Sequence, residues 1–212
     1  MSENLTIDDA ATRWSAGDRE RMPLLVLLHG YGADENDLFG LVPHLPEGFA
    51  VASVAAPLSP PWPMPGRSWY PIEGLDGRDA THVTAAAEAL LRWLDTTGAE
   101  RIALLGFSQG AAVSLQALRL APERIGAVVA LSGYATPGEL PRDADLTELR
   151  PPVFWGRGTN DDVIPPNLIV HTADWLPAHS DLSGRVYTGL THSISEDELL
   201  DVTQFLTRWL ES

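Results

Sequence analysis

The sequence predicts an α/β fold: a mostly parallel, doubly wound sheet with helices on both faces. Short, continuous apolar runs alternate along the chain with segments of helical spacing. These runs lack apolar–polar alternation, which is typical of parallel strands buried on both faces. The chain has 212 residues, enough for an ordinary core, and no internal linker. We therefore expect one domain, residues 1–212, without a cap over the sheet.

The apolar runs locate the strands. An edge strand is expected at 5–7, where a short apolar stretch precedes a polar turn. Further strands are expected, in chain order, at 24–29, 50–55, 101–105, 127–132, 153–156 and 185–188.

Helices are expected between these strands. One helix is expected to begin near Asp34, a second to cover 82–97 and a third to follow Ser108. A fourth covers 166–178, and a fifth closes the chain. Pro122 ends the helix after Ser108, and the apolar residues around that helix indicate that it is buried. Ser195, with Glu198 three residues later, forms a capping box at the start of the last helix.

Two segments are predicted to be irregular. The stretch 57–80 contains six prolines, a density that excludes a long helix, together with several aromatic residues. The stretch 135–150 is polar and has room for at most one short helix; its acids Asp143, Asp145 and Glu148 are interpreted as solvated.

Composition excludes several classes of function. The formal net charge is −15, which disfavours nucleic acid and anionic membrane surfaces as partners. The chain has no cysteine, so disulfides, thiolate metal sites and a cysteine nucleophile are excluded. No run is long enough to insert in a membrane, and the first residues do not resemble a secretory signal. A cytoplasmic protein is expected.

A strand, a sharp turn and a helix meet at the pentapeptide 106–110. Its sequence, Gly-Phe-Ser-Gln-Gly, has the G-x-S-x-G pattern of the nucleophile elbow in α/β-hydrolases. Glycines at Gly106 and Gly110 are expected because a Cβ there would collide with the neighbouring strand and helix. Ser108 is therefore the predicted nucleophile, at the apex of a strained turn.

A serine nucleophile requires a base and an acid later in the chain. Of the three downstream histidines, His171 lies inside a predicted helix and His179 lies near the end of that helix, and both are interpreted as ordinary surface or packing residues. His192 follows the last strand, where catalytic groups of open α/β sheets collect, and is the predicted base. Asp161 and Asp162 both follow the preceding strand, and because consecutive residues point in opposite directions, only one should face the histidine.

Two backbone N–H groups should form the oxyanion hole. One belongs to Gln109, directly after the nucleophile, and the other is assigned to Tyr31 in the turn after the first buried strand. His29 is interpreted as structural, holding that turn by a hydrogen bond. The acids of 34–37 match no Ca²⁺ loop and are interpreted as the start of a helix, so no metal or organic cofactor is expected.

The segments 28–38 (LHGYGADENDL) and 106–111 (GFSQGA) resemble the phospholipase/carboxylesterase family, which includes acyl-protein thioesterases and small bacterial esterases. The likeness extends through 131–134, the D-x-x-x-P of 161–165 and the G-x-x-H of 189–192, and covers essentially the whole chain.

The resemblance implies a capless α/β-hydrolase with a shallow site that hydrolyses carboxylic or thio-esters. It selects Asp161 as the acid, since the family aspartate stands four residues before a proline, and it places the second oxyanion donor on Tyr31. Ser68, Trp69 and Tyr70 resemble the aromatic segment that borders the family's acyl groove.

Two residues depart from the family pattern. Arg157 replaces the usual histidine of a His-Gly pair, and Asp162 replaces a frequent proline. A second carboxylate beside Asp161 is expected to raise its pKa by like-charge repulsion, with Arg157 offsetting that rise.

The predicted function is a serine carboxylesterase that acts on small to medium acyl or aryl esters. The predicted substrate-binding residues are Trp69, Tyr70 and Leu75, in the aromatic loop 57–80. We expect small soluble esters rather than lipidated proteins as substrates, because the net charge of −15 disfavours lysophospholipid bilayers as a docking surface. The alternatives are an acyl-protein thioesterase or lysophospholipase, or a catalytically silent binding protein on the same fold. The exposed aromatics of the loop would also suit a weak homodimer.

Overall fold

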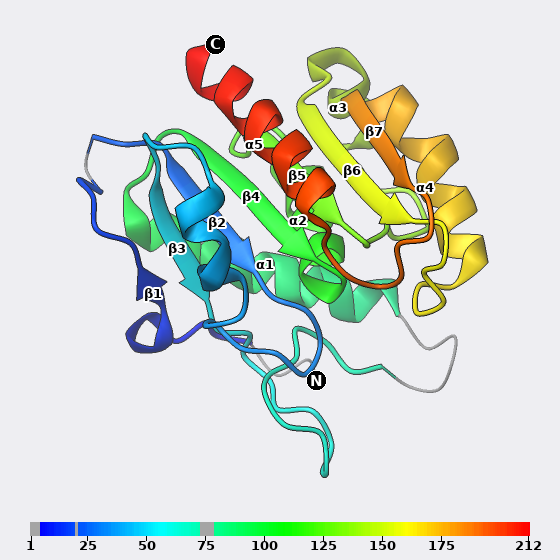
Figure 1. Cartoon of the computed structure of the whole chain (residues 1–212), viewed down its shortest axis with the longest axis horizontal. Coiled ribbons are helices and arrows are strands. Elements are labelled where there is room, and N and C mark those ends of the chain that lie inside the picture. Colours follow the sequence, from blue (N-terminus) through cyan, green and yellow to red (C-terminus); the bar gives the residue numbers. More distant parts are fainter. Residues whose placement is uncertain (1–4, 20, 73–78) are drawn as a thin grey trace.

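The computed structural model describes residues 5–19, 21–72 and 79–212. Within them, seven strands form one sheet in the order β1-β3-β2-β4-β5-β6-β7 (Figure 1). The strands are β1 Arg13–Trp14, β2 Leu24–Leu28, β3 Ala50–Val54, β4 Ile102–Phe107, β5 Ala127–Leu131, β6 Pro152–Gly158 and β7 Asp181–Tyr187. All neighbours pair in parallel except β1, which runs antiparallel to β3. The predicted α/β fold is confirmed, and no cap domain is present among the described residues.

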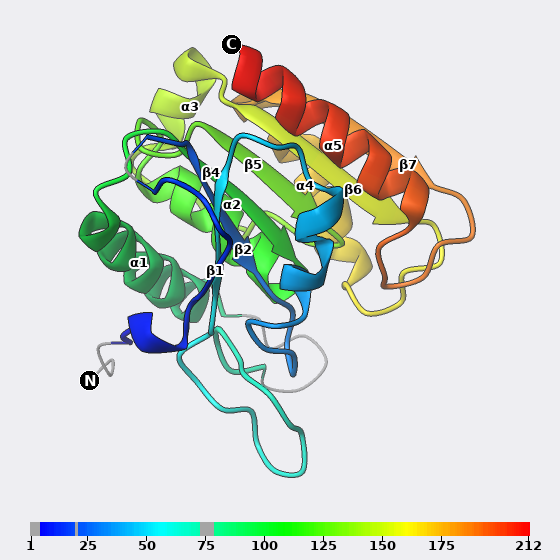
Figure 2. The ribbon, with the colours of Figure 1, turned by 60° about the vertical axis from the view of Figure 1, so that its left-hand side comes forward.

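Helices cover both faces of the sheet. They are the 3₁₀ helices η1 Asp9–Ala11 and η2 Leu38–His44, and the α-helices α1 Ala80–Thr97, α2 Gln109–Leu120, α3 Asp143–Leu149, α4 Pro166–His179 and α5 Glu196–Glu211. The helices α1, α2 and α4 cover one face, and η2 and α5 cover the other (Figure 2). Apolar residues of each group form a core against the sheet.

The two cores explain the continuous apolar runs. Successive strand residues point to opposite faces, so both sets must be apolar when both faces are covered. In β2, Val26 and Leu28 belong to the α1–α2 core, whereas Leu25 and Leu27 belong to the α5 core. None of the four is exposed.

The edge strand is not where the sequence predicted it. Residues 5–7 are not a strand; Ile7 is buried against the α1 side of the molecule, and Arg92 of α1 donates to the Leu5 carbonyl at 3.0 Å. The edge is β1, whose Arg13 pairs with Ser53 of β3. A two-residue edge strand carries too little periodicity to be recognised from sequence.

The helix expected near Asp34 begins later, at Leu38, and is a 3₁₀ helix. The Asp34 carboxylate accepts from the Asn36 N–H at 2.8 Å, which holds 34–37 in turns rather than in a first helical turn. Pro43 lies inside η2 and cannot donate a helical hydrogen bond.

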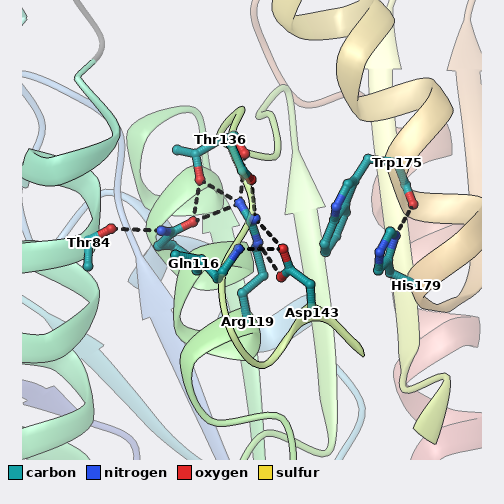
Figure 3. Close-up of polar contacts among 9 residues, drawn as sticks. Thr84, Gln116, Arg119, Thr136, Asp143, Trp175 and His179 are labelled. Atoms are coloured by element: carbon teal, nitrogen blue, oxygen red, sulfur yellow. Dashed lines mark hydrogen bonds and ion pairs between the residues drawn. The ribbon is translucent and has the colours of Figure 1, made fainter. Parts of the chain in front are cut away.

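Asp143 was predicted to be solvated, and this is wrong. It begins α3 and is buried, where it accepts from Arg119 of α2 at 2.8 and 2.6 Å (Figure 3). The local sequence around Asp143 is polar, so the burial follows from a contact 24 residues away along the chain. Asp145 and Glu148 lie partly or fully at the surface.

The strand order reverses between β2 and β4, since β3 lies on one side of this pair and β5 on the other. Open α/β sheets bind ligands at the carboxyl ends of the strands at such a point. Leu28 pairs with Gly106, so the turns that follow β2 and β4 lie next to each other. No helix in the described part of the chain has both the length and the apolar character needed to span a membrane.

Candidate active site

The turn after β4 is strained, as its pattern predicts. Ser108 has a φ of +55°, in the left-handed region, and its N–H donates to the Leu131 carbonyl at 2.9 Å. A Cβ on Gly106 would lie 2.3 Å from the Gly110 carbonyl, and one on Gly110 would lie 2.0 Å from the Leu28 oxygen. Both positions therefore require glycine, and the turn projects the serine beyond the sheet.

His192 bridges Ser108 and Asp161. Its Nε2 is 2.9 Å from the Ser108 Oγ, and its Nδ1 is 2.8 Å from Asp161 Oδ2. Because the carboxylate can only accept, Nδ1 carries the proton and Nε2 is left to accept from the serine hydroxyl. The His192 ring packs on Phe107 with ring centroids 4.9 Å apart, which fixes its orientation.

Of the two candidate acids, Asp161 faces the histidine. Its side chain is 1% exposed, whereas Asp162 is at the surface. Burial would raise the pKa of Asp161, but the hydrogen bond and charge of His192, with the N–H groups of Val163 and Ile164, hold it below the ordinary value. The prediction that Asp162 raises the pKa of Asp161 is wrong. Asp162 is exposed, so solvent screens its charge.

The two proposed oxyanion donors line one cavity of about 210 Å³ together with Ser108 and His192. Within the described part of the chain, neither the Tyr31 N–H nor the Gln109 N–H donates to another protein group. Both donors are therefore available to a substrate oxygen.

His29 is buried and holds the oxyanion turn, as predicted. Its Nδ1–H donates to the Gly30 carbonyl at 2.7 Å, and its Nε2 accepts from the Ala56 N–H at 3.1 Å. Burial is the largest influence on its pKa, which lies below the usual value, so the ring is neutral and keeps this tautomer.

The three predicted substrate residues have different positions. Trp69 and Tyr70 are both fully buried, but only Tyr70 lines the cavity; Leu75 lies outside the described residues. The sequence did not single out Tyr134 and Ile164, which also line the cavity. Both follow the carboxyl ends of predicted strands, which is the signal that would have identified them.

Among the described residues, no group of three or more His, Asp or Glu side chains is arranged to hold a metal ion. The site brings together groups that suit acyl transfer: a serine, a histidine and a carboxylate in hydrogen-bond contact, and two backbone N–H groups of residues that line the same cavity.

A sequence model of the family described as Phospholipase/Carboxylesterase matches residues 11–210. The chain belongs to this family. Among curated relatives, acyl-protein thioesterase 1 of Saccharomyces cerevisiae is 35% identical over 117 residues, which are 53% of this chain and 52% of the relative. The chain thus matches about half the length of that relative.

Solved structures agree with the family assignment. The crystal structure of esterase PE8 has a TM-score of 0.78 and 25% identity, and the match covers 96% of this chain and 99% of that one. The Bacillus cereus carboxylesterase has a TM-score of 0.80 at 18% identity, covering 93% of each chain; at this identity the likeness shows the shared fold alone.

Proposed function

We propose that the protein is a serine carboxylesterase that hydrolyses small to medium acyl or aryl esters. The observation that carries this proposal is the bridge made by His192, within 2.9 Å of Ser108 on one side and 2.8 Å of Asp161 on the other. The family assignment and the likeness to esterase PE8 support it.

In the proposed reaction, the Ser108 oxygen attacks the carbonyl carbon of the ester while His192 Nε2 takes the hydroxyl proton. Asp161 holds the Nδ1–H and stabilises the imidazolium. The N–H groups of Tyr31 and Gln109 donate to the oxyanion. As the intermediate collapses, His192 returns the proton to the leaving alcohol. Water, activated by the same nitrogen, then releases the carboxylic acid from the acyl-enzyme.

The cavity indicates the substrate class. It measures about 210 Å³, and among the described residues that line it none is Lys or Arg. A cavity of this size and character suits an uncharged acyl or aryl group better than an anionic headgroup.

We propose that the whole chain, residues 1–212, acts as one hydrolase domain. The proposed cytoplasmic location is based on the sequence alone.

A thioesterase activity is the second candidate. It is favoured by the curated relatives, which are named acyl-protein thioesterase 1. The same triad and oxyanion hole serve both esters and thioesters, so the two activities differ in the leaving group. The third candidate, a silent binding protein, requires a broken triad, and the three side chains here are in hydrogen-bond contact.

The test is turnover of p-nitrophenyl esters of increasing chain length, with matched acyl thioesters and with labelling by a fluorophosphonate. We expect turnover that declines for long acyl chains, and labelling at Ser108. The variant Ser108→Ala should lose roughly 10⁴-fold or more in kcat. Equal turnover by Ser108→Ala would refute the triad, and a protein that neither turns over nor labels would be the silent binder.

A further inference from the structure

Residues 66–70, which we name the clasp, are bonded to the oxyanion turn at 29–33. The Gly32 N–H donates to the Arg67 carbonyl at 2.9 Å, and the Arg67 N–H donates to the Ala33 carbonyl at 2.8 Å. A Cβ on Gly66 would lie 2.2 Å from the Gly32 oxygen, so the two backbones approach as closely as glycine allows. The clasp therefore runs directly along the turn that carries Tyr31.

A third bond joins the clasp to the start of the same turn. The indole N–H of Trp69 donates to the His29 carbonyl at 2.8 Å. Trp69 is fully buried, and its ring lies 5.6 Å from that of His29. The side chain predicted to touch substrate instead supports the oxyanion turn from within.

On its other side, the clasp is bonded to the side chain of Gln109. The Gln109 Oε1 accepts from the Trp69 N–H at 3.0 Å and from the Ser68 hydroxyl at 3.3 Å, while the Nε2 donates to the Tyr70 carbonyl at 2.7 Å. Gln109 is buried, so these bonds replace water that cannot reach the amide.

The clasp thus joins the two halves of the oxyanion hole. One donor, the Tyr31 N–H, belongs to the turn after β2; the other, the Gln109 N–H, begins α2. Oxyanion donors act only when both stand about 2.7–3.1 Å from the developing charge. The separation between a turn and a helix start is set by whatever connects them, and the clasp is bonded to both.

We propose that Trp69 and the Gln109 side chain are positioning residues, which act through the clasp to hold the Tyr31 and Gln109 N–H groups at the separation that the oxyanion requires. This inference rests on the proposed esterase function. Gln109 then has two separate roles: its backbone N–H contacts the substrate oxygen, and its side chain fixes where the partner donor stands.

The chain offers a matched pair of variants. Trp69→Phe retains a buried aromatic ring but removes the N–H that reaches His29, together with part of the indole ring. Trp209→Phe is the control, because Trp209 makes the same kind of bond, from its indole N–H to the Gly126 carbonyl at 3.0 Å, beside the opposite end of the sheet. Gln109→Glu is a second test, since it keeps the size and replaces the donating Nε2 by an acceptor.

The measurements are kcat and KM for a p-nitrophenyl ester, and inhibition by a trifluoromethyl ketone and by the product carboxylic acid. Trp69→Phe should lower kcat roughly tenfold or more with KM little changed. Affinity for the ketone, which forms a tetrahedral oxyanion on Ser108, should fall by the same factor, while affinity for the acid is unchanged. Trp209→Phe should lower thermal stability similarly and leave kcat unchanged. Gln109→Glu should repeat the loss of kcat.

Three outcomes would decide against the inference. If Trp69→Phe keeps the wild-type kcat, or loses kcat only as much as Trp209→Phe, the clasp is merely structural. If KM alone rises, the clasp is a substrate wall. If the losses in Trp69→Phe and Gln109→Glu multiply in the double variant, the two residues do not act through one connection. Failure of the proposed function itself is distinct, since the wild-type protein would then show no Ser108-dependent turnover.

Discussion

Asp143 and Glu198 are buried carboxylates on opposite faces of the sheet, and they differ in whether they have a hydrogen-bond partner. Asp143 lies on the α2 side, where both its oxygens accept from Arg119 and one also accepts from the Leu140 N–H (Figure 3). Glu198 lies in the first turn of α5 and is fully buried, with Oε1 close against Gly156. Neither of its oxygens accepts a well-formed hydrogen bond from a described residue.

The two carboxyl groups respond to burial in opposite directions. Burial raises the pKa of both, but for Asp143 the bidentate Arg119 outweighs it, and the pKa falls below the ordinary value. For Glu198, burial raises the pKa to about 7, the Asp201 charge adds to the rise, and the Ser195 N–H opposes it. The hydrogen-bond partner, rather than burial, therefore decides whether each of these internal acids is charged at neutral pH.

Arg119, the partner of Asp143, also fixes the segment that follows β5. Arg119 also donates to the Thr136 carbonyl at 2.7 Å and to the Gly138 carbonyl at 2.6 Å, and its guanidinium lies 4.9 Å from the centre of the Trp175 ring (Figure 3). This holds the polar stretch after β5 against α2 and α4. Arginine alone among the cationic side chains carries five N–H donors in a fixed plane, so only arginine can bind this set of carboxylate and carbonyl oxygens.

A third buried carboxylate, Asp161, has a histidine as its partner, and removing that partnership should have the largest effect. Asp161→Asn should lower kcat roughly 10³- to 10⁴-fold, because the amide no longer enforces the Nδ1–H tautomer of His192. Asp162→Asn, at the surface, is the matched control and should change kcat by less than about threefold. Steady-state kinetics on a p-nitrophenyl ester measure both. A larger loss in Asp162→Asn would reverse the assignment of the acid.

Arg119→Met should have the next largest effect, because it leaves Asp143 buried without its counter-charge. We expect unfolding free energy to fall by roughly 3–5 kcal/mol. Urea denaturation of the variant measures this. The control Arg142→Met removes exposed ion pairs with Glu123 and Asp145 and should be far milder. Equal losses from the two variants would show that the buried pair contributes no more than a surface pair.

Local pattern sufficed to predict much of the fold and two of the three proposed triad residues. The strands β2 to β6 follow from uninterrupted apolar runs, and Ser108 and His192 from short motifs whose geometry is set by adjacent residues. Local pattern left Asp161 and Asp162 as alternatives, and family resemblance selected Asp161. The choice is visible in the structure because only Asp161 turns inward.

What the sequence did not reveal depends on pairings between distant residues. Asp143 looks solvated until Arg119 is placed beside it, and Trp69 looks like a substrate contact until its N–H is seen to reach His29, 40 residues earlier. The capping box predicted Ser195 correctly, since its hydroxyl accepts from the Glu198 N–H at 3.1 Å. The same pattern gave no sign that the Glu198 carboxyl is buried, because that depends on Gly156 in another strand.

Glu198→Gln tests the unpaired carboxyl through the pH dependence of stability. In the unfolded chain the group ionises near its ordinary value of 4.5, and in the folded protein near about 7. Between these values only the unfolded chain releases the proton, so rising pH favours unfolding. The variant should match the wild type at pH 4 and be more stable by roughly 3 kcal/mol at pH 8.

Urea midpoints at the two pH values measure the difference. Glu88→Gln, on the exposed side of α1, is the control and should show no pH-dependent gain. Equal stability of Glu198→Gln and wild type at pH 8 would mean that the buried carboxylate has an effective partner, and the contrast with Asp143 would no longer hold.

The smallest expected change in stability comes from Ser195→Ala, which tests whether the helix cap acts independently of the Glu198 carboxyl group. Ser195→Ala removes the oxygen that accepts from the Glu198 N–H and should cost about 1 kcal/mol of unfolding free energy. This loss should be the same at pH 4 and pH 8, because a neutral hydroxyl is removed, whereas the gain from Glu198→Gln appears only at the higher pH. If the loss in Ser195→Ala instead grew with pH, the cap and the carboxyl would be one coupled unit. The pKa of Glu198 would then depend on the structure of the helix start as well as on the absence of a hydrogen-bond partner.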